Sequence, residues 1–133
     1  MNYTIVPSAI FTFPEAASVG LTQEQACEQG YSVRGDSFHF RLLGKSHAMG
    51  EIAGHVKIIS DAYSRKILGV HIVGPHASDL IAEGALAMQL GATVEDLAST
   101  IHAHPTLSEA LMEASRTALG FGTYCPPLNP INS

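Results

Sequence analysis

The fold of this chain is decided by two runs, HVKIIS at 55–60 and KILGVHIV at 66–73. Both runs are rich in β-branched residues, and the second is apolar for almost its whole length, which indicates a central, well-buried strand. The polar link DAYSR at 61–65 separates them. Two β-rich runs around a link of this length predict a β-hairpin.

Shorter patterns before the hairpin predict strands and one helix. Residues 9–13 form a β-rich run that ends at Pro14, and residues 31–40 are also expected to be extended. Between them, TQEQ at 22–25 has the form of a capping box that opens a short helix. Residues 43–54 contain three glycines and small or polar residues, and are expected to form a loop.

Helical patterns follow the hairpin. Residues 78–90 are apolar around much of a helix circumference, Thr93 can cap a short helix to about Thr100, and an apolar stripe runs from Leu107 to Ala118. This order predicts the α+β class, with an antiparallel sheet and helices packed on one face. We expect one domain at 1–122 and a proline-rich tail at 123–133.

The composition excludes several classes of function. The chain has 133 residues, 46% hydrophobic and 14% charged, and a net charge of -5 with seven Lys plus Arg. This balance predicts neither nucleic-acid binding nor a basic membrane-surface helix. No membrane span or signal peptide is recognisable, so we expect a cytoplasmic protein, or a mitochondrial-matrix protein if eukaryotic. Cys27 and Cys125 are far apart, which favours reduced thiols.

The run IHAHPTLSE at 101–109 contains a possible proton-transfer pair. Pro105 disfavours the α region for His104, so a helix can begin only after the proline. The imidazole of His104 would then precede the helix, and the carboxylate of Glu109 would lie in its first turn. This arrangement suits a general base and the group that orients it.

Two other interpretations of the run stay open. Thr106 to Glu109 also matches a capping box, in which Thr106 is the N-cap and the Glu109 side chain bonds the Thr106 amide. His102 and His104 would share a face if extended and could hold a metal, but no third ligand stands at suitable spacing, so we predict no metal site.

Four motifs in order resemble the C-terminal interface, or dimerisation, domain of dihydrolipoamide dehydrogenases: VPSAIFTFPE at 6–15, GHVKII at 54–59, ILGVHIVG at 67–74 and HAHPTLSE at 102–109. The match runs from about Val6 to Ser115. The resemblance implies a flavoprotein disulfide reductase fold and a homodimer that serves the lipoamide-bearing acyltransferase of 2-oxo acid dehydrogenase complexes. The chain also looks like a fragment cut at a domain boundary.

The resemblance also implies roles for individual residues. His104 would be the acid/base for dihydrolipoamide thiols, Glu109 would orient its ring, and a cis His104-Pro105 peptide would face the FAD of the partner subunit. FAD and NAD would bind only the full-length enzyme, because this sequence has no G-x-G-x-x-G after a strand and no Cys-x4-Cys pair. We therefore expect the isolated chain to be inactive. The alternative function is a non-catalytic self-association module whose His-Pro segment only starts a helix.

Overall fold

The expected hairpin lies at the centre of a sheet in the computed structural model, which describes residues 5–120. Strands β4 (His55–Asp61) and β5 (Ile67–Val73) pair antiparallel, with Ile58 opposite Val70, and a register shift follows Ile59. The fully buried side chains of these strands include Val56, Ile58 and Val70. The apolar pattern of the two runs thus becomes the inner part of the core.

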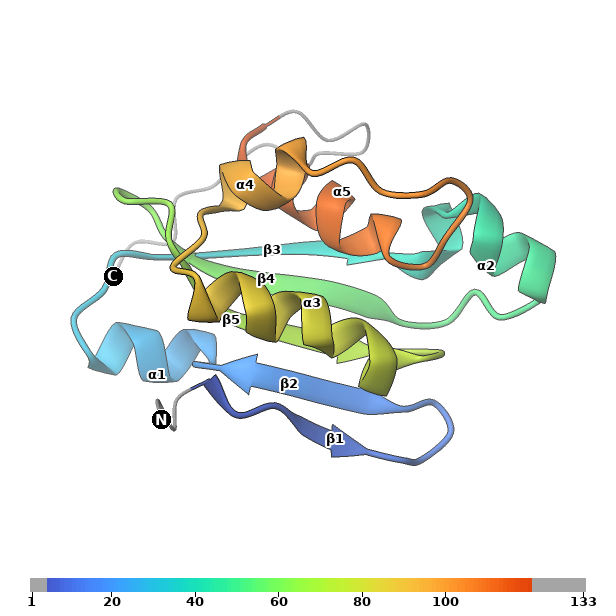
Figure 1. The fold of residues 1–133 in the computed structure, drawn as a ribbon. Coiled ribbons are helices and arrows are strands. Elements are labelled where there is room, and N and C mark those ends of the chain that lie inside the picture. Colours follow the sequence, from blue (N-terminus) through green and yellow to red (C-terminus); the bar gives the residue numbers. More distant parts are fainter. Residues whose placement is uncertain (1–4, 121–133) are drawn as a thin grey trace.

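Three further strands extend the hairpin on both sides (Figure 1). β2 (Ala16–Gly20) pairs with β5, β1 (Ser8–Ile10) pairs with β2, and β3 (Val33–His39) pairs with β4. The order is therefore β1-β2-β5-β4-β3, and every pairing is antiparallel. The predicted antiparallel sheet is confirmed.

The longer helices cover one face of the sheet, as predicted. α3 (Ala77–Gln89) packs on β2 and β5, and α5 (Glu109–Ala118) packs on β3 and β4. α4 (Val94–Ser99) lies against α5 and begins after the expected N-cap Thr93, which forms a capping box with Asp96. The main core lies between these helices and the sheet, and it includes Phe40, Ile72, Ile81 and Leu111.

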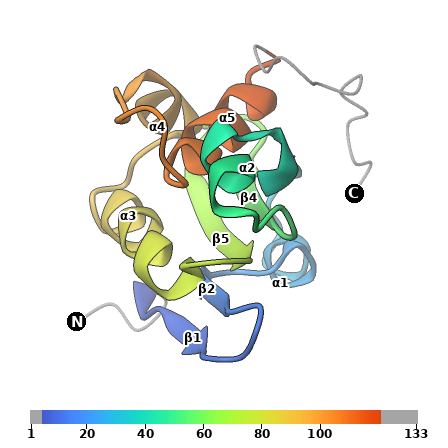
Figure 2. The ribbon, with the colours of Figure 1, turned by 90° about the vertical axis from the view of Figure 1, so that its right-hand side faces the viewer.

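A short helix, α1 (Gln23–Glu28), lies on the other side of the sheet (Figure 2). Its buried Ala26 forms a second apolar cluster with Val33, Ile59 and Leu68. The predicted capping box opens this helix: the Gln25 amide donates to the Thr22 hydroxyl oxygen, and the Thr22 amide donates to the side-chain oxygen of Gln25.

The structure corrects the loop expected at residues 43–54. Residues Phe40–Leu42 form a 3-10 turn, and α2 (Gly44–Met49) follows it. Gly44 is the first residue of α2, and Gly50 ends it with a left-handed φ of 70°. The glycines therefore mark the ends of a short helix, since a left-handed C-terminal residue is the usual helix stop. Within residues 43–54, Leu43 and the stretch from Gly50 to Gly54 lie outside helices and strands.

The proline-rich tail predicted at 123–133 and the residue Cys125 lie outside the described residues. Cys27 is a free, exposed thiol on α1. Among residues 5–120, no helix has the length and apolar character needed to cross a membrane.

Candidate functional site

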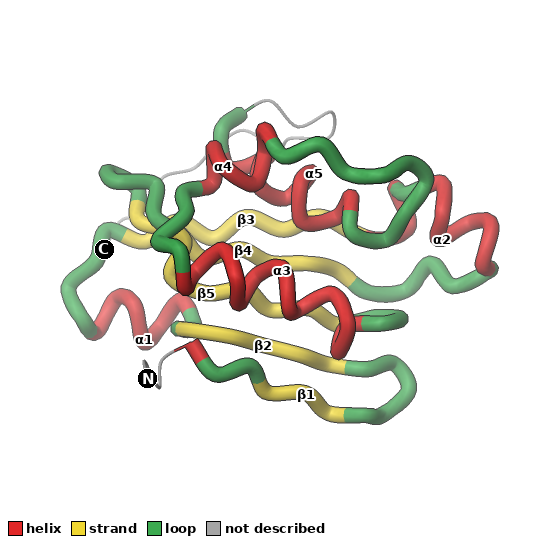
Figure 3. The backbone as a smooth tube through the Cα atoms, viewed as in Figure 1, coloured by secondary structure: helices red, strands yellow, loops and turns green. Residues whose placement is uncertain are grey.

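His104 of the predicted proton-transfer pair lies in the connection between α4 and α5, at residues 100–108 (Figure 3), and Glu109 is the first residue of α5. The last helix starts later than the sequence suggested. Thr106 was expected as its N-cap, but α5 begins at Glu109 with Ser108 in the N-cap position. The Thr106 hydroxyl instead donates to the carbonyl of Ala103 at 2.6 Å. The His104-Pro105 peptide is cis, as the resemblance implied.

Glu109 bonds both the His104 ring and the Thr106 amide, the two partners that the sequence predicted separately. Its Oε1 accepts from the Thr106 amide at 2.8 Å, and both of its carboxylate oxygens lie 3.0 Å from Nδ1 of His104. One half of the predicted capping box is therefore present, and it coexists with the His-Glu pair. The tight turn brings the carboxylate back over the loop and fixes the His104 ring.

The two partners differ in their access to solvent. The His104 side chain is 77% exposed, whereas the Glu109 side chain is 16% exposed. Partial burial works to raise the pKa of Glu109, but the Thr106 amide, the hydrogen bond to His104 and the charges of His104 and His102 outweigh it and lower this pKa below its ordinary value of 4.5. Glu109 is thus a carboxylate near neutral pH.

The Glu109 carboxylate selects one form of the His104 ring. An ionised carboxylate is only an acceptor, so a neutral His104 must carry its proton on Nδ1. The lone pair then lies on Nε2, and the His104 hydrogen bonds within residues 5–120 all run through Nδ1. The arrangement can therefore accept a proton from an external group at Nε2, with the new positive charge stabilised by Glu109.

His102 does not join His104 at a common ligand. Its Nδ1 lies 2.9 Å from the Thr100 carbonyl oxygen, and its Nε2 lies 2.5 Å from Oε1 of Glu83 on α3. Its side chain is 6% exposed. Both ring nitrogens thus have partners within the protein, and the described part of the chain has no cluster of three or more His, Cys, Asp or Glu suited to a metal.

Sequence reasoning missed the partner of His102. The two residues are 19 positions apart and lie on different elements, so no local motif connects them. One signal was available. Glu83 is a charged residue within a helix that is apolar around much of its circumference, and a charge in such surroundings usually has a partner.

A second pair of titratable groups lies on neighbouring strands. The rings of His39 and His55 are 5.9 Å apart between centroids, at the paired ends of β3 and β4. Burial, followed by the charges of His39 and Lys57, lowers the pKa of His55 below 6.5. No sequence pattern associates these two histidines, because their pairing depends on the register of β3 and β4.

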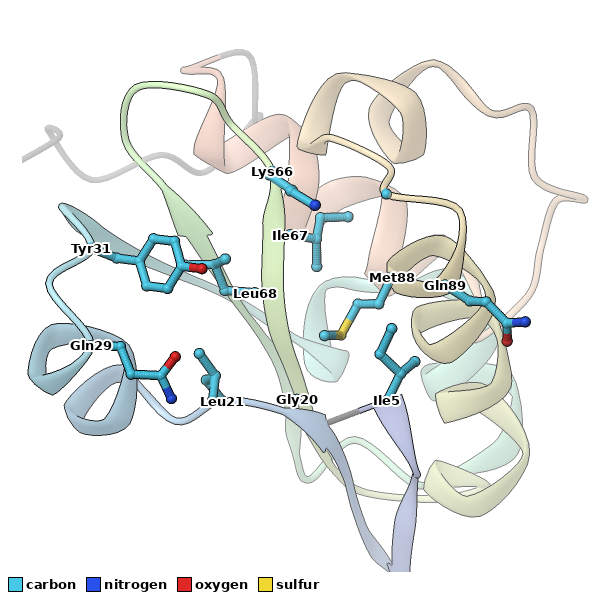
Figure 4. Close-up of a pocket in the computed structure, with 11 residues that line it drawn as sticks. Ile5, Gly20, Leu21, Gln29, Tyr31, Lys66, Ile67, Leu68, Met88 and Gln89 are labelled. Atoms are coloured by element: carbon cyan, nitrogen blue, oxygen red, sulfur yellow. The ribbon is translucent and has the colours of Figure 1, made fainter. Parts of the chain in front are cut away.

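A pocket of about 360 Å³ lies between α1, the start of β5 and the end of α3 (Figure 4). Leu21, Ile67 and Met88 are among its apolar lining residues, and Tyr31 and Lys66 are among its polar ones. None of the residues proposed for chemistry lines it. We therefore assign the candidate site to the loop between α4 and α5.

Comparisons with known proteins give the chain its context. Residues 6–115 match the family model described as the pyridine nucleotide-disulphide oxidoreductase dimerisation domain. A dihydrolipoyl dehydrogenase of Halobacterium salinarum is 48% identical over 124 residues, which cover 93% of this chain and 26% of that protein. The chain thus spans about a quarter of the length of the curated relatives it matches.

Solved structures agree with the sequence comparison. The crystal structure of LpdA from Mycobacterium tuberculosis superposes with a TM-score of 0.81 and 31% identity, covering 87% of this chain and 25% of that one. The HOCl-induced flavoprotein disulfide reductase RclA from Escherichia coli gives a TM-score of 0.79 and 26% identity, covering 83% of this chain and 25% of that one.

Proposed function

The chain belongs to the pyridine nucleotide-disulphide oxidoreductase dimerisation-domain family, and from this premise we propose that it supplies an acid/base pair, His104 and Glu109, to a dihydrolipoyl dehydrogenase. In this proposal the pair acts on the disulfide site of the partner subunit in a homodimer. The observation that carries the proposal is the exposed His104 ring held at Nδ1 by the Glu109 carboxylate.

The proposed reaction step is a proton transfer. A thiol with a pKa near the free-cysteine value of about 8.5 is mostly protonated at neutral pH, and we expect the same of a dihydrolipoamide thiol. Its S–H bond breaks as Nε2 of His104 takes the proton, which leaves a thiolate and an imidazolium. Glu109 stabilises the imidazolium through Nδ1, and the proton returns by the same route in the reverse direction. Thiolates are the reactive form in exchange with a disulfide.

The exposure of the loop supports an action across a subunit interface. Ile101 is 96% exposed, and it lies close in sequence to the exposed His104 ring. In a dimer of this kind, a partner subunit that covers the His104 ring would cover Ile101 as well. A site completed from two subunits also explains why the base projects from the domain.

The residues of this chain suit the edge of a flavin site rather than the main FAD pocket. They offer an exposed imidazole next to Pro105, but the sequence has no G-x-G-x-x-G motif to hold a dinucleotide. FAD would supply electron transfer between the disulfide and NAD in the full-length enzyme. We propose that FAD and NAD bind other parts of that enzyme, and that the isolated chain is inactive.

The partners and location of the full-length enzyme follow from the same proposal. It would act on the lipoamide-bearing acyltransferase of a 2-oxo acid dehydrogenase complex. We propose that the enzyme lies in the cytoplasm, or in the mitochondrial matrix of a eukaryote.

A chimeric enzyme tests the catalytic role. Residues 6–115 would replace the matching segment of the Halobacterium salinarum relative, and NAD-dependent oxidation of dihydrolipoamide would be measured with and without His104→Gln. We expect His104→Gln to lower kcat by about 10²-fold or more, the usual contribution of general acid–base catalysis, with an unchanged flavin absorption spectrum. Turnover within a few-fold of the parent chimera would instead favour the non-catalytic self-association module.

A further inference from the structure

The contact between His102 and Glu83 is a partly buried pair that takes no part in the proposed proton transfer. The His102 side chain is 6% exposed and that of Glu83 is 28% exposed. Removing charged groups from water costs free energy unless they are paired and hydrogen-bonded. This pair satisfies that condition, because His102 also bonds the Thr100 carbonyl oxygen through its second nitrogen.

The contact links the connection between α4 and α5 (residues 100–108, the site loop) to helix α3, which packs on the centre of the sheet. Glu83 belongs to α3, which packs on β2 and β5, whereas Glu109 belongs to α5. His102 and His104 are separated only by Ala103, so each of these two ring side chains bonds a carboxylate on a different helix. The short segment between them is therefore fixed from two sides.

A further link runs through Ala103. Its carbonyl oxygen accepts the Thr106 hydroxyl at 2.6 Å, and the Thr106 amide donates to Glu109 at 2.8 Å. A displacement of His102 would move the Ala103 carbonyl and, with it, the turn that holds Thr106 and Glu109 together. In addition, the charge of His102 is one of the causes that lower the pKa of Glu109.

We propose that Glu83 and His102 are positioning residues that hold the site loop on α3 and thereby keep the His104 ring in its bond with Glu109. The importance of these two residues for catalysis rests on the proposed function. The contacts that hold the loop lie within this chain and can be tested without turnover. Neither residue touches the proposed substrate. Their effect reaches Nε2 of His104 only through the orientation of the loop.

The test uses the 133-residue chain labelled with ¹⁵N in its histidines. The ¹⁵N shifts of the imidazole report which nitrogen of His104 carries the proton, and amide exchange reports the bond from Thr106. In the parent chain we expect the proton on Nδ1. Glu83→Ala should shift His104 toward the tautomer mixture of a free imidazole, and should raise the exchange rate of the Thr106 amide about tenfold, the size of one net hydrogen bond.

Two further variants keep the result interpretable. Glu83→Gln retains the size of the side chain and removes its charge, so it should shift His104 in the same direction by less, even if Glu83→Ala unfolds the chain. Asp79→Asn is the matched control, because Asp79 lies on the same helix beside His76 but is 82% exposed, and it should leave both readouts unchanged.

The inference would be overturned if both Glu83 variants gave the His104 tautomer and Thr106 exchange of Asp79→Asn. The His104 tautomer and the Thr106 amide exchange are measured without turnover. The positioning role of Glu83 and His102 can therefore fail or hold independently of the catalytic role of His104. A changed tautomer in Glu83→Ala together with a fully active His104→Gln chimera would support the positioning role and reject the proposed catalytic role.

Discussion

Replacing Glu109 tests whether one carboxylate supports both the loop and the helix. Glu109→Ala removes the bond from the Thr106 amide, the bond from His104 and a negative charge in the first turn of α5. A hydrogen bond to a charged group contributes about 1.5–3 kcal/mol, and a helix-end charge about 0.3–1 kcal/mol. Because the His104 ring is 77% exposed, its share is small, and we expect a total loss of about 2 kcal/mol.

The assay is urea unfolding followed by circular dichroism, at several pH values. The folded-state pKa of Glu109 is lowered, so its contribution is fully present above the unfolded value of 4.5 and is lost as the pH falls through the folded value. The difference between the parent chain and Glu109→Ala should therefore be fully present above pH 4.5 and should shrink as the pH falls below it.

A matched control separates the bonds of Glu109 from the effect of charge on a helix. Glu24 lies in the first turn of α1 and is exposed, so Glu24→Gln should cost about 0.5 kcal/mol or less. A stabilising role for the Glu109 bonds is refuted if Glu109→Ala costs no more than Glu24→Gln at pH 7, or if its cost is the same at pH 3 as at pH 7.

Other substitutions probe the strands and the core. His39→Gln should raise the pKa of His55 part of the way toward 6.5, measured by NMR titration, because it removes one charge and leaves the burial; an unchanged pKa would contradict this. Leu111→Ala in the fully buried core should cost about 3 kcal/mol in urea unfolding, against about 0.5 kcal/mol for Leu90→Ala at a 75% exposed position, and equal losses would disprove the assigned core. A Cβ on Gly84 would lie 3.0 Å from a β5 side chain, so Gly84→Val should lower the free energy of unfolding by about 1–3 kcal/mol, and an unchanged midpoint would rule out that close approach.

The sequence predicted the central hairpin and the longer helices because their patterns are local. β-branched runs, capping boxes and an apolar stripe each need only a few neighbouring residues to be recognised. The sequence predicts a loop at residues 43–54 instead of a helix for two reasons. A helix as short as α2 has too few turns to show the 3.6-residue helical period, and its end glycines are typical of loops.

The site was predictable only in its local part. His104 and Glu109 are close enough in sequence for the turn at Pro105 to bring them together, and the capping-box pattern predicts the bond from the Thr106 amide to Glu109. The sequence could not show that one carboxylate makes both bonds at once. The His102-Glu83 contact depends on how α3 packs against the site loop. Such a contact arises from tertiary packing, for which a single sequence has no local signal.

A mixed dimer of the chimeric enzyme tests directly whether His104 acts on the site of the partner subunit. One subunit would carry His104→Gln, and the other would have serines in place of the redox cysteines of the relative's segment; each homodimer should be inactive. If His104 serves the partner's site, every mixed dimer retains one working site, so random mixing should restore about a quarter of the parent activity. Mixed dimers with no more activity than the two inactive parents would contradict a base supplied across the interface.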